Sequence, residues 1–260
     1  MNQLPENRDL GQATPEFLSY VTTPFARFVT DSHNLRFRKN FMTYVSLTIL
    51  LILYPALAVI GAGEDPLALL RNLDHSMLMF LLVSTIVIQW FIFGINYASI
   101  YLEETGLAGI GFRGFRLVHL AWVVAFLLAS NLLLSGLAWV LGQLGYPMAG
   151  EVGLLIPTDP TGQVVWFFVA LTAGICEEVA FRGYLMTRLR LLFKLNSWWI
   201  PTILSAVSFG ICHTYQGLPG FIVITVYGAL FSILYIRTGS IWPCIIAHFF
   251  QDFGALFFPH

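Results

Sequence analysis

Charged residues are scarce in this sequence: Asp, Glu, Lys and Arg make up 10% of its 260 residues, against about 25% in soluble globular proteins. So few charges cannot cover a soluble protein of this size, and a hydrophobic content of 57% agrees with that reasoning. A cytosolic enzyme and a disordered protein are therefore excluded. The net charge of −1 and the lack of a basic run argue against a nucleic-acid partner. We expect an integral membrane protein surrounded by membrane lipid.

Cysteines and leader signals are also sparse. The three cysteines all lie in apolar stretches, which excludes a disulfide scaffold and suits small buried side chains. The first 39 residues are rich in charge and lack the apolar core of a signal peptide. We therefore expect residues 1–40 to form a polar extension and the run from about Phe41 to Gly61 to act as an uncleaved insertion signal.

Seven apolar runs are candidates for membrane spans. They lie at about 41–61, 77–101, 117–141, 164–182, 198–215, 221–236 and 241–258. The last three are short and crowded, so the total is six to eight. Only helices and closed barrels cross lipid, and no alternating barrel pattern is present, so we predict an all-α, polytopic helical bundle. We divide it into N-terminal helices at 41–162 and a C-terminal set at 163–258.

Lys and Arg are distributed unevenly among the loops, which predicts an orientation. Alternate loops, beginning with the N-terminal segment, carry almost all of these residues. They are Arg36, Arg38, Lys39, Arg113, Arg116, Arg188, Arg190, Lys194 and Arg237, against Arg71 alone on the other side. We expect the N-terminus to be cytoplasmic and the C-terminus external, and a bacterial inner membrane is favoured as the location.

Several ionisable residues interrupt the C-terminal apolar runs. They are Glu177, Glu178, Arg182, His213, His248 and Asp252, with His119 in an earlier run. A charge inside a span costs roughly 2.5–3.5 kcal/mol on insertion scales, so such residues usually face a polar interior and have a function. The alternative for each residue is a structural ion pair or a packed polar side chain. We assign that alternative to His119, which has no acidic partner at helical spacing.

The spacing of the acidic residues predicts a division of roles. Glu178 and Arg182 are four apart with the acid first, which favours an ion pair on one helix face. Glu177 lies about 100° around the helix, so it lacks that partner. One carboxylate is then held by the arginine, while its neighbour is left free to act as a general base that activates water.

The histidines show a similar spacing. Phe209 and His213 are four apart, as are His248 and Asp252, and an Asp one turn from a His can orient its ring. Two histidines and a glutamate could also form a zinc site of the His₂Glu type, with ligands from three helices, because no H-E-x-x-H motif is present. A thiol nucleophile at Cys176 or Cys212 is disfavoured, since nothing marks either as activated. Ala206 and Gly210 indicate close helix packing.

These motifs in their order resemble the CPBP family, the intramembrane proteases also called CAAX, bacteriocin-processing or Abi proteases. The similar stretches are Glu177-Glu178-x-x-x-Arg182, Phe209-x-x-x-His213 and His248-x-x-x-Asp252, with Arg237-Thr-Gly-Ser-Ile-Trp-Pro before the last. The resemblance covers about residues 163–256. It implies a helical membrane bundle that hydrolyses peptide bonds, whose eukaryotic branch cleaves after a prenylated cysteine.

The resemblance also implies roles for these residues. Glu177 and His213 would hold and deprotonate the attacking water, while Glu178 and Arg182 would position the helix or the substrate backbone. His248 and Asp252 would stabilise the oxyanion, although the family commonly has Asn at the last position. An ionised Asp252 cannot donate a hydrogen bond, so it must be protonated or must orient His248 instead.

Glu177 and His213 can meet only if the fourth span is a long, tilted helix. We predict that helix from about Gly162 to Arg190, with Glu177 near its middle and Arg188 and Arg190 at the headgroups. A plain span beginning near Val164 would place Glu177 and His213 at different depths.

The leading hypothesis is an intramembrane endopeptidase that acts through water activated by glutamate and histidine. Its substrate would be a membrane-associated or lipid-modified protein or peptide, and no cofactor would be required, with a divalent metal such as zinc left open. The alternative is a non-catalytic immunity, scaffold or regulatory protein on the same fold. A proton-coupled transporter ranks last, since no inverted repeat is apparent.

Overall fold

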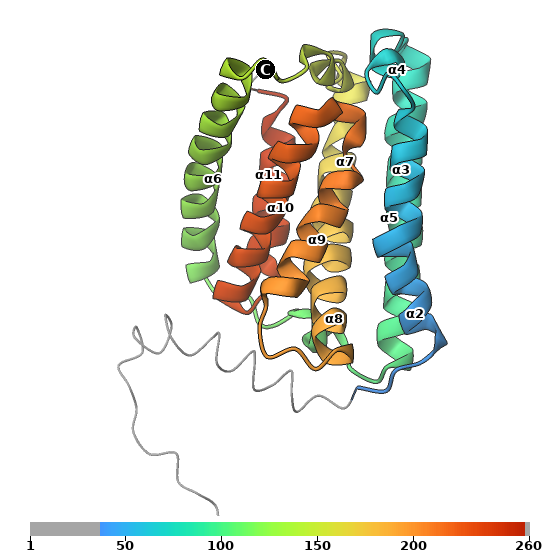
Figure 1. Cartoon of the computed structure of the whole chain (residues 1–260), viewed down its shortest axis with the longest axis vertical. Helices are drawn as coiled ribbons and strands as arrows, with labels where there is room; N and C mark the ends of the chain where they lie inside the picture. Colours follow the sequence, from blue (N-terminus) through green and yellow to red (C-terminus); the bar gives the residue numbers. More distant parts are fainter. Residues whose placement is uncertain (1–36, 258–260) are drawn as a thin grey trace, which may run out of the picture.

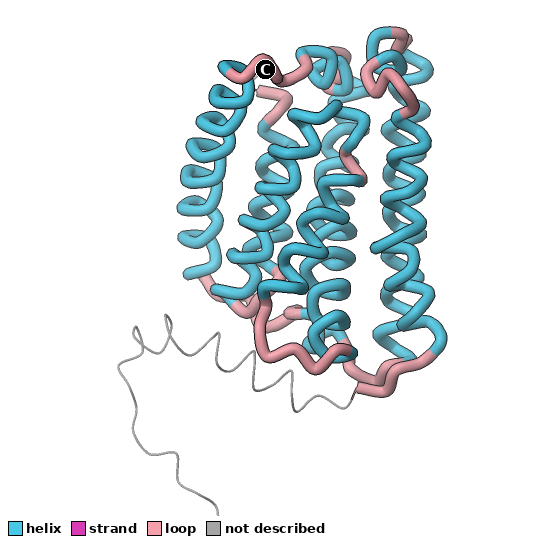
Figure 2. The backbone as a smooth tube through the Cα atoms, viewed as in Figure 1, coloured by secondary structure: helices cyan, strands magenta, loops and turns pink. Residues whose placement is uncertain are grey.

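The computed structural model describes residues 37–257, and every regular element in that part of the chain is helical (Figures 1 and 2). The predicted all-α fold is confirmed. Five continuous helical segments are long and apolar enough to cross a membrane, and two shorter helices complete the bundle. These five segments and the two shorter helices coincide with the seven apolar runs of the sequence.

The N-terminal half supplies three of the long segments. The first combines α2 (Phe41–Thr48), the π-helix η1 (Ile49–Leu53) and α3 (Tyr54–Ala62). The second is α5 (His75–Leu102), which follows the short α4 (Ala68–Arg71), and the third is α6 (Val118–Gln143). The 3₁₀ turns η2 (Leu107–Ile110) and η3 (Gly150–Leu155) lie in the connections that precede and follow α6.

The C-terminal half carries the rest of the bundle. A helix of 33 residues combines α7 (Pro160–Glu177), the π-helix η4 (Glu178–Leu185) and α8 (Met186–Leu192). It is followed by α9 (Trp199–Ile211), the 3₁₀ turn η5 (Thr214–Gln216), α10 (Gly217–Thr238) and α11 (Trp242–Gly254). Figure 1 shows α2 and α8 at one end of the bundle, and the loop that carries η3 at the other end.

Helix ends coincide with capping residues in the sequence. The side chain of Asp74 accepts from the Met77 backbone N–H at the start of α5, and Asp159 accepts from Gly162 N–H at the start of α7. Asn40 and Thr43 form a reciprocal capping box at the start of α2. Each cap satisfies backbone donors that a helix leaves unpaired in its first turn.

Small residues allow α9 and α10 to pack closely, as the Ala206 and Gly210 spacing predicts. A Cβ atom added at Gly210 would collide with the Thr225 hydroxyl, and one added at Gly228 would lie 3.2 Å from the Ala206 Cα. Gly111 is a different case, because its φ of +91° and the nearby Tyr235 ring both exclude a side chain. Its carbonyl accepts from Ile241 N–H, which ties the turn after η2 to the start of α11.

Arg188 was predicted to lie at the headgroups, but it forms a buried ion pair. Its side chain is fully buried, with Nη2 2.7 Å from Glu103 Oε2 and Nε 2.9 Å from the same oxygen. Arg190 is also buried, and its Nε donates to the Leu195 carbonyl at 3.1 Å. The sequence pattern misled us because Glu103 is 85 residues away along the chain.

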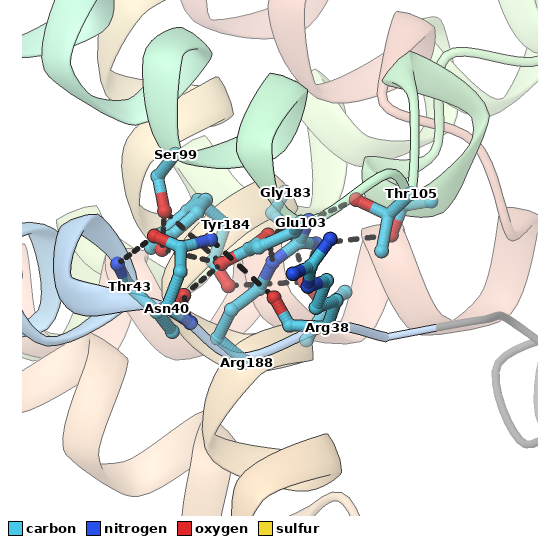
Figure 3. A network of polar contacts seen from close by, with 11 residues as sticks. Arg38, Asn40, Thr43, Ser99, Glu103, Thr105, Gly183, Tyr184 and Arg188 are labelled. Carbon is cyan, nitrogen blue, oxygen red and sulfur yellow. Dashed lines mark hydrogen bonds and ion pairs between the residues drawn. The ribbon is translucent and has the colours of Figure 1, made fainter.

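Every polar side-chain atom of this pair has a partner, and Figure 3 shows residues from several segments converging on it. The other carboxylate oxygen of Glu103 accepts from three hydroxyls, and Arg188 also donates to two hydroxyls and a carbonyl. These partners are Thr43, Ser99 and Tyr184 for Glu103, and Thr105, Thr187 and the Gly109 carbonyl for Arg188. The network, here called the Glu103–Arg188 cluster, joins α8 to α2, α5 and the connection before α6.

Candidate active site

The long fourth helix carries three of the predicted residues near its middle, at the junction of α7 and η4. Glu177 is the last residue of α7, and Glu178 and Arg182 lie in the π-helix. The prediction of one long helix through this region is therefore confirmed. π-Helical turns occur frequently at functional sites because they change the direction in which side chains project.

The length of this helix places Glu177 and His213 at similar depths. Fifteen residues separate Glu177 from the end of α8 at Leu192, a rise of about 22 Å. Fourteen residues separate His213 from the start of α9 at Trp199, a rise of about 21 Å along a chain that begins at the same end of the bundle. The difference in depth that a plain span would have created is absent.

Glu178 and Arg182 form the predicted ion pair on one helix face. Arg182 Nη1 lies 2.7 Å from Glu178 Oε1, and both side chains are fully buried. The guanidinium also lies 4.3 Å from the centre of the Phe209 ring and 5.0 Å from that of Phe231. Its Nη2 is 3.4 Å from the Gly228 carbonyl. The aromatic faces and the carboxylate together stabilise a charge that would otherwise be costly to bury.

Glu178 has a second partner that sequence reasoning missed. His248 Nδ1, on α11, lies 2.7 Å from Glu178 Oε1, so one carboxylate oxygen bridges Arg182 and His248. An ionised carboxylate only accepts hydrogen bonds, which assigns a proton to Nδ1 of His248. The other ring nitrogen, Nε2, lies 3.8 Å from Glu177 Oε2 and 3.5 Å from Asp252 Oδ2.

Asp252 is a weaker partner of His248 than the spacing predicts. Its carboxylate is within ion-pair range of Nε2, but the short hydrogen bond on the ring belongs to Glu178 at Nδ1. The Asp252 side chain is 32% exposed, whereas that of His248 is 6% exposed. The backbone carbonyl of Asp252 accepts from the Trp166 indole N–H at 2.9 Å, which fixes the end of α11 against α7. Glu178 is thus the residue that sets the orientation of His248.

Glu177 was predicted to be free of partners, but the structure shows one. It does lack the arginine, but Gln89 Nε2 on α5 donates to its Oε1 at 2.6 Å. Its other oxygen, Oε2, is buried and accepts no hydrogen bond from the described protein groups. Gln89 was missed because it lies in an apolar run outside the motifs, although it is the only glutamine in that helix.

His213 joins the cluster through aromatic contacts. It lies two residues after the end of α9, and its Nδ1 lies 2.9 Å from the Phe209 carbonyl, which leaves Nε2 as an acceptor when the ring is neutral. The Phe209 ring centre lies 4.8 Å from the His213 ring and 6.3 Å from the His248 ring. Within residues 37–257, no hydrogen bond or ion pair joins His213 to Glu177. The three sequence motifs nevertheless meet around one phenylalanine.

The donors do not form a metal site as they lie. No group of three or more His, Cys, Asp or Glu residues in the described part of the chain has an arrangement that could hold a metal ion. His248 donates from Nδ1 to Glu178, so Nε2 is the ring nitrogen left to face Glu177 and Asp252.

The remaining predictions concern side chains beside the cluster. Cys176 and Cys244 are buried and Cys212 is partly buried, and all three are free thiols. Cys244 Sγ lies 3.6 Å from the Phe231 carbonyl, and neither Cys176 nor Cys212 forms a hydrogen bond with a histidine among the described residues. His119 is buried and accepts from the Arg116 backbone N–H, which agrees with the structural role assigned to it.

Comparison with known proteins gives one match, which falls on the segment that carries the site. Residues 160–254 match the family model described as type II CAAX prenyl endopeptidase Rce1-like. This segment is similar to the CAAX endopeptidases. The match is consistent with the CPBP resemblance and confirms it for these residues, although they are less than half of the chain. No curated protein and no solved structure matches significantly.

The match and the helices together define the general class of activity. An Rce1-like segment indicates a CAAX-type intramembrane endopeptidase, that is, a hydrolase with a protein or peptide substrate in the membrane. The apolar helices agree with an integral membrane protein.

Proposed function

We propose that the protein hydrolyses a peptide bond of a membrane-associated or lipid-modified substrate with water activated by Glu177 and His213. The observation that carries this proposal is the contrast between adjacent glutamates. Glu178 is fully buried and bonded through one oxygen to the Arg182 guanidinium and to His248, whereas Glu177 is 13% exposed and its one hydrogen bond comes from the neutral amide of Gln89. Because Glu177 has no cationic partner such as Arg182, its carboxylate is the better placed of the two to accept a proton from water.

The reaction follows from the positions of the remaining groups. As the water oxygen adds to the substrate carbonyl carbon, its proton passes to Glu177, with His213 Nε2 as the second acceptor for the water. Collapse of the tetrahedral intermediate breaks the carbon–nitrogen bond, and the same proton passes to the leaving amine. No covalent acyl-enzyme forms, and no step requires a metal.

His248 is the oxyanion donor in this proposal. Glu178 holds Nδ1, so Nε2 is directed toward Glu177 and Asp252, where the substrate carbonyl would lie. When Nε2 carries a proton it donates to the developing oxyanion, an interaction that strengthens as the charge forms. Asp252 then acts on the ring of His248 and does not itself donate to the oxyanion.

The first experiment compares cells that express wild type with cells that express Glu177→Gln at matched protein levels. Mass spectrometry of membrane and exported proteins would detect the new peptide termini. We expect a set of termini that appears with wild type and is absent with Glu177→Gln. Glu64→Gln, the same substitution at an exposed position, is the matched control and should give the wild-type termini.

Identical termini in wild-type and Glu177→Gln cells would contradict the catalytic proposal and favour the scaffold or regulatory alternative. A purified-enzyme assay then tests the substrate class, with a peptide whose prenylated cysteine precedes three C-terminal residues and the same peptide without the lipid. Cleavage of the prenylated peptide alone would support a lipid-modified substrate. Loss of cleavage on treatment with a chelator, with recovery on addition of Zn²⁺, would contradict the metal-free reaction.

We also propose that the N-terminus is cytoplasmic and that the protein resides in a bacterial inner membrane. The end of the bundle that holds the start of α2 and the end of α8 carries nearly all of the basic loop residues, as expected of a cytoplasmic face. Alkaline phosphatase fused after residue 260 should be active, and the same reporter in the 103–117 connection should be inactive. The reverse pattern would overturn the orientation.

A further inference from the structure

Gln89 is the only described residue outside the matched segment 160–254 that forms a hydrogen bond with Glu177. It lies on α5, 88 positions before the glutamate, and its side chain is almost completely buried. Its Nε2 donates to Glu177 Oε1 at 2.6 Å. A residue from the N-terminal helices thus contacts the proposed general base directly.

The two oxygens of the Glu177 carboxylate have different surroundings. Oε1 is held by Gln89, while Oε2 lies 3.8 Å from His248 Nε2 and accepts no hydrogen bond from the described groups. A carboxylate on a flexible side chain has several rotamers, and the amide of Gln89 selects the one that turns Oε2 toward His248. Loss of that constraint would leave the base misplaced with respect to the substrate.

A small cavity adjoins this contact. Gln89, Glu177, Cys176 and Tyr54 line it, together with apolar side chains, and it offers about 10 Å³ to the centre of a water molecule. That space is close to the minimum of roughly 10–15 Å³ that one water requires. Gln89 Oε1, like Glu177 Oε2, is buried without a donor among the described protein groups. Both oxygens are covered by neighbouring atoms, so the contact between the two residues is the hydrogen bond from the Gln89 amide N–H to Glu177 Oε1.

We propose that Gln89 is a positioning residue for hydrolysis, whose amide N–H fixes the Glu177 carboxylate. This inference rests on the proposed function, since it gives Gln89 a role only through Glu177. It also means that α5 forms part of the active site, although α5 lies outside the segment that resembles the protease family.

The chain provides a matched control two turns further along the same helix. Asn96 is also a buried amide on α5, and neither its side-chain oxygen nor its nitrogen has a partner among the described groups. Asn96→Leu therefore removes a buried amide from α5 without touching Glu177. Gln89→Met removes the amide and keeps a side chain of similar length, and Gln89→Asn keeps the amide but withdraws it by one carbon.

The kinetic test uses purified full-length protein and the prenylated peptide described above. We expect both Gln89 variants to lower kcat by about ten- to a hundredfold, the scale of a misplaced catalytic group, with KM changed by less than about twofold. Asn96→Leu should leave both constants within about twofold of wild type. Wild-type kcat in Gln89→Met, or an equal loss of kcat in Asn96→Leu, would overturn the proposal, because the amide of Gln89 would then have no particular role.

A second measurement does not depend on catalysis. The infrared difference between wild type and Glu177→Gln isolates the carboxyl band of Glu177 in the membrane. We expect that band to shift in Gln89→Met and in Gln89→Asn, and to stay unchanged in Asn96→Leu. An unchanged band in the Gln89 variants would overturn the proposed contact. If one Gln89 variant does not fold, the other decides the result.

The two arms separate this inference from the proposed function. If Glu177→Gln cleaves the peptide as well as wild type does, the proposed function fails, and the infrared band still tests the contact. If Glu177→Gln is inactive while Gln89→Met keeps full activity, the proposed function stands and the positioning role of Gln89 fails.

Discussion

The two clusters of buried charge on the long fourth helix differ in how completely their polar atoms are paired. In the Glu103–Arg188 cluster, both carboxylate oxygens and all three guanidinium nitrogens have partners. In the candidate active site, Glu177 Oε2, Glu178 Oε2, Arg182 Nε and Gln89 Oε1 are buried without one. Buried polar groups are normally satisfied, so the incomplete cluster is the one suited to bind a substrate and water. The complete cluster is suited to hold helices together.

The largest expected difference between the clusters is in catalysis. Glu177→Gln should reduce the rate of peptide cleavage by about 10²- to 10⁴-fold, the range for loss of a general base. Its melting temperature should stay unchanged or rise, because a neutral amide replaces a buried carboxylate oxygen without a donor. The checks are a cleavage assay and thermal unfolding in detergent. A large fall in melting temperature would show that Glu177 is structural, as Glu103 is.

Arg188→Met should have the opposite profile. Removing one partner of a fully buried ion pair leaves the other charge unpaired, at a cost of about 3–5 kcal/mol in the free energy of unfolding. The double variant Glu103→Met with Arg188→Met should recover part of that loss, since neither charge remains. Unfolding by denaturant in detergent measures both. A single variant as stable as wild type would contradict the contrast between the clusters.

Asp252→Asn should have a much smaller effect. Glu178 already holds His248 through Nδ1, while Asp252 is partly exposed and 3.5 Å from Nε2. We expect the rate of cleavage to change by less than about fivefold, the range of a weak, partly exposed ion pair. Steady-state kinetics on the purified protein would measure it. A loss above tenfold would show that the carboxylate of Asp252, and not Glu178 alone, controls the histidine.

The smallest effect is expected away from both clusters, at Asp159. The hydrogen bond from the Gly162 backbone, and then nearby His75, keep the pKa of this exposed carboxyl below its ordinary value. Its charge therefore contributes stability that is fully present above about pH 4 and is lost as the pH falls through the lowered pKa. Asp159→Asn should lower the melting temperature slightly at pH 7, with the difference vanishing in strong acid. A difference that persists in acid would contradict a role for the charge.

Hydropathy was sufficient to predict the helices, because lipid permits few alternatives for a backbone that must satisfy its own hydrogen bonds. The seven runs and the long fourth helix were all correctly expected. Local spacing also identified the Glu178–Arg182 pair, since both residues lie on one helix. The candidate site residues themselves remain predictions of catalysis that the experiments above must test.

The contacts that sequence reasoning missed all join helices that are distant in the chain. Gln89 reaches Glu177 from α5, His248 reaches Glu178 from α11, and Glu103 reaches Arg188 across 85 positions. Helical periodicity gives the face of a residue but not the helix that covers this face. Arg188 was assigned to the headgroups for the same reason, because no local signal shows a buried acidic partner.

The π-helix η4 carries residues of both clusters, and this has a consequence for the length of the fourth helix. Glu177 precedes η4, while Arg188 follows it on α8. Each residue removed from a helix rotates everything beyond it by about 100°. Suppose that one residue of η4 is deleted and Arg188 keeps its ion pair with Glu103. The active-site glutamates would then be rotated away from α5 and α11. This segment should therefore tolerate substitutions far better than insertions or deletions.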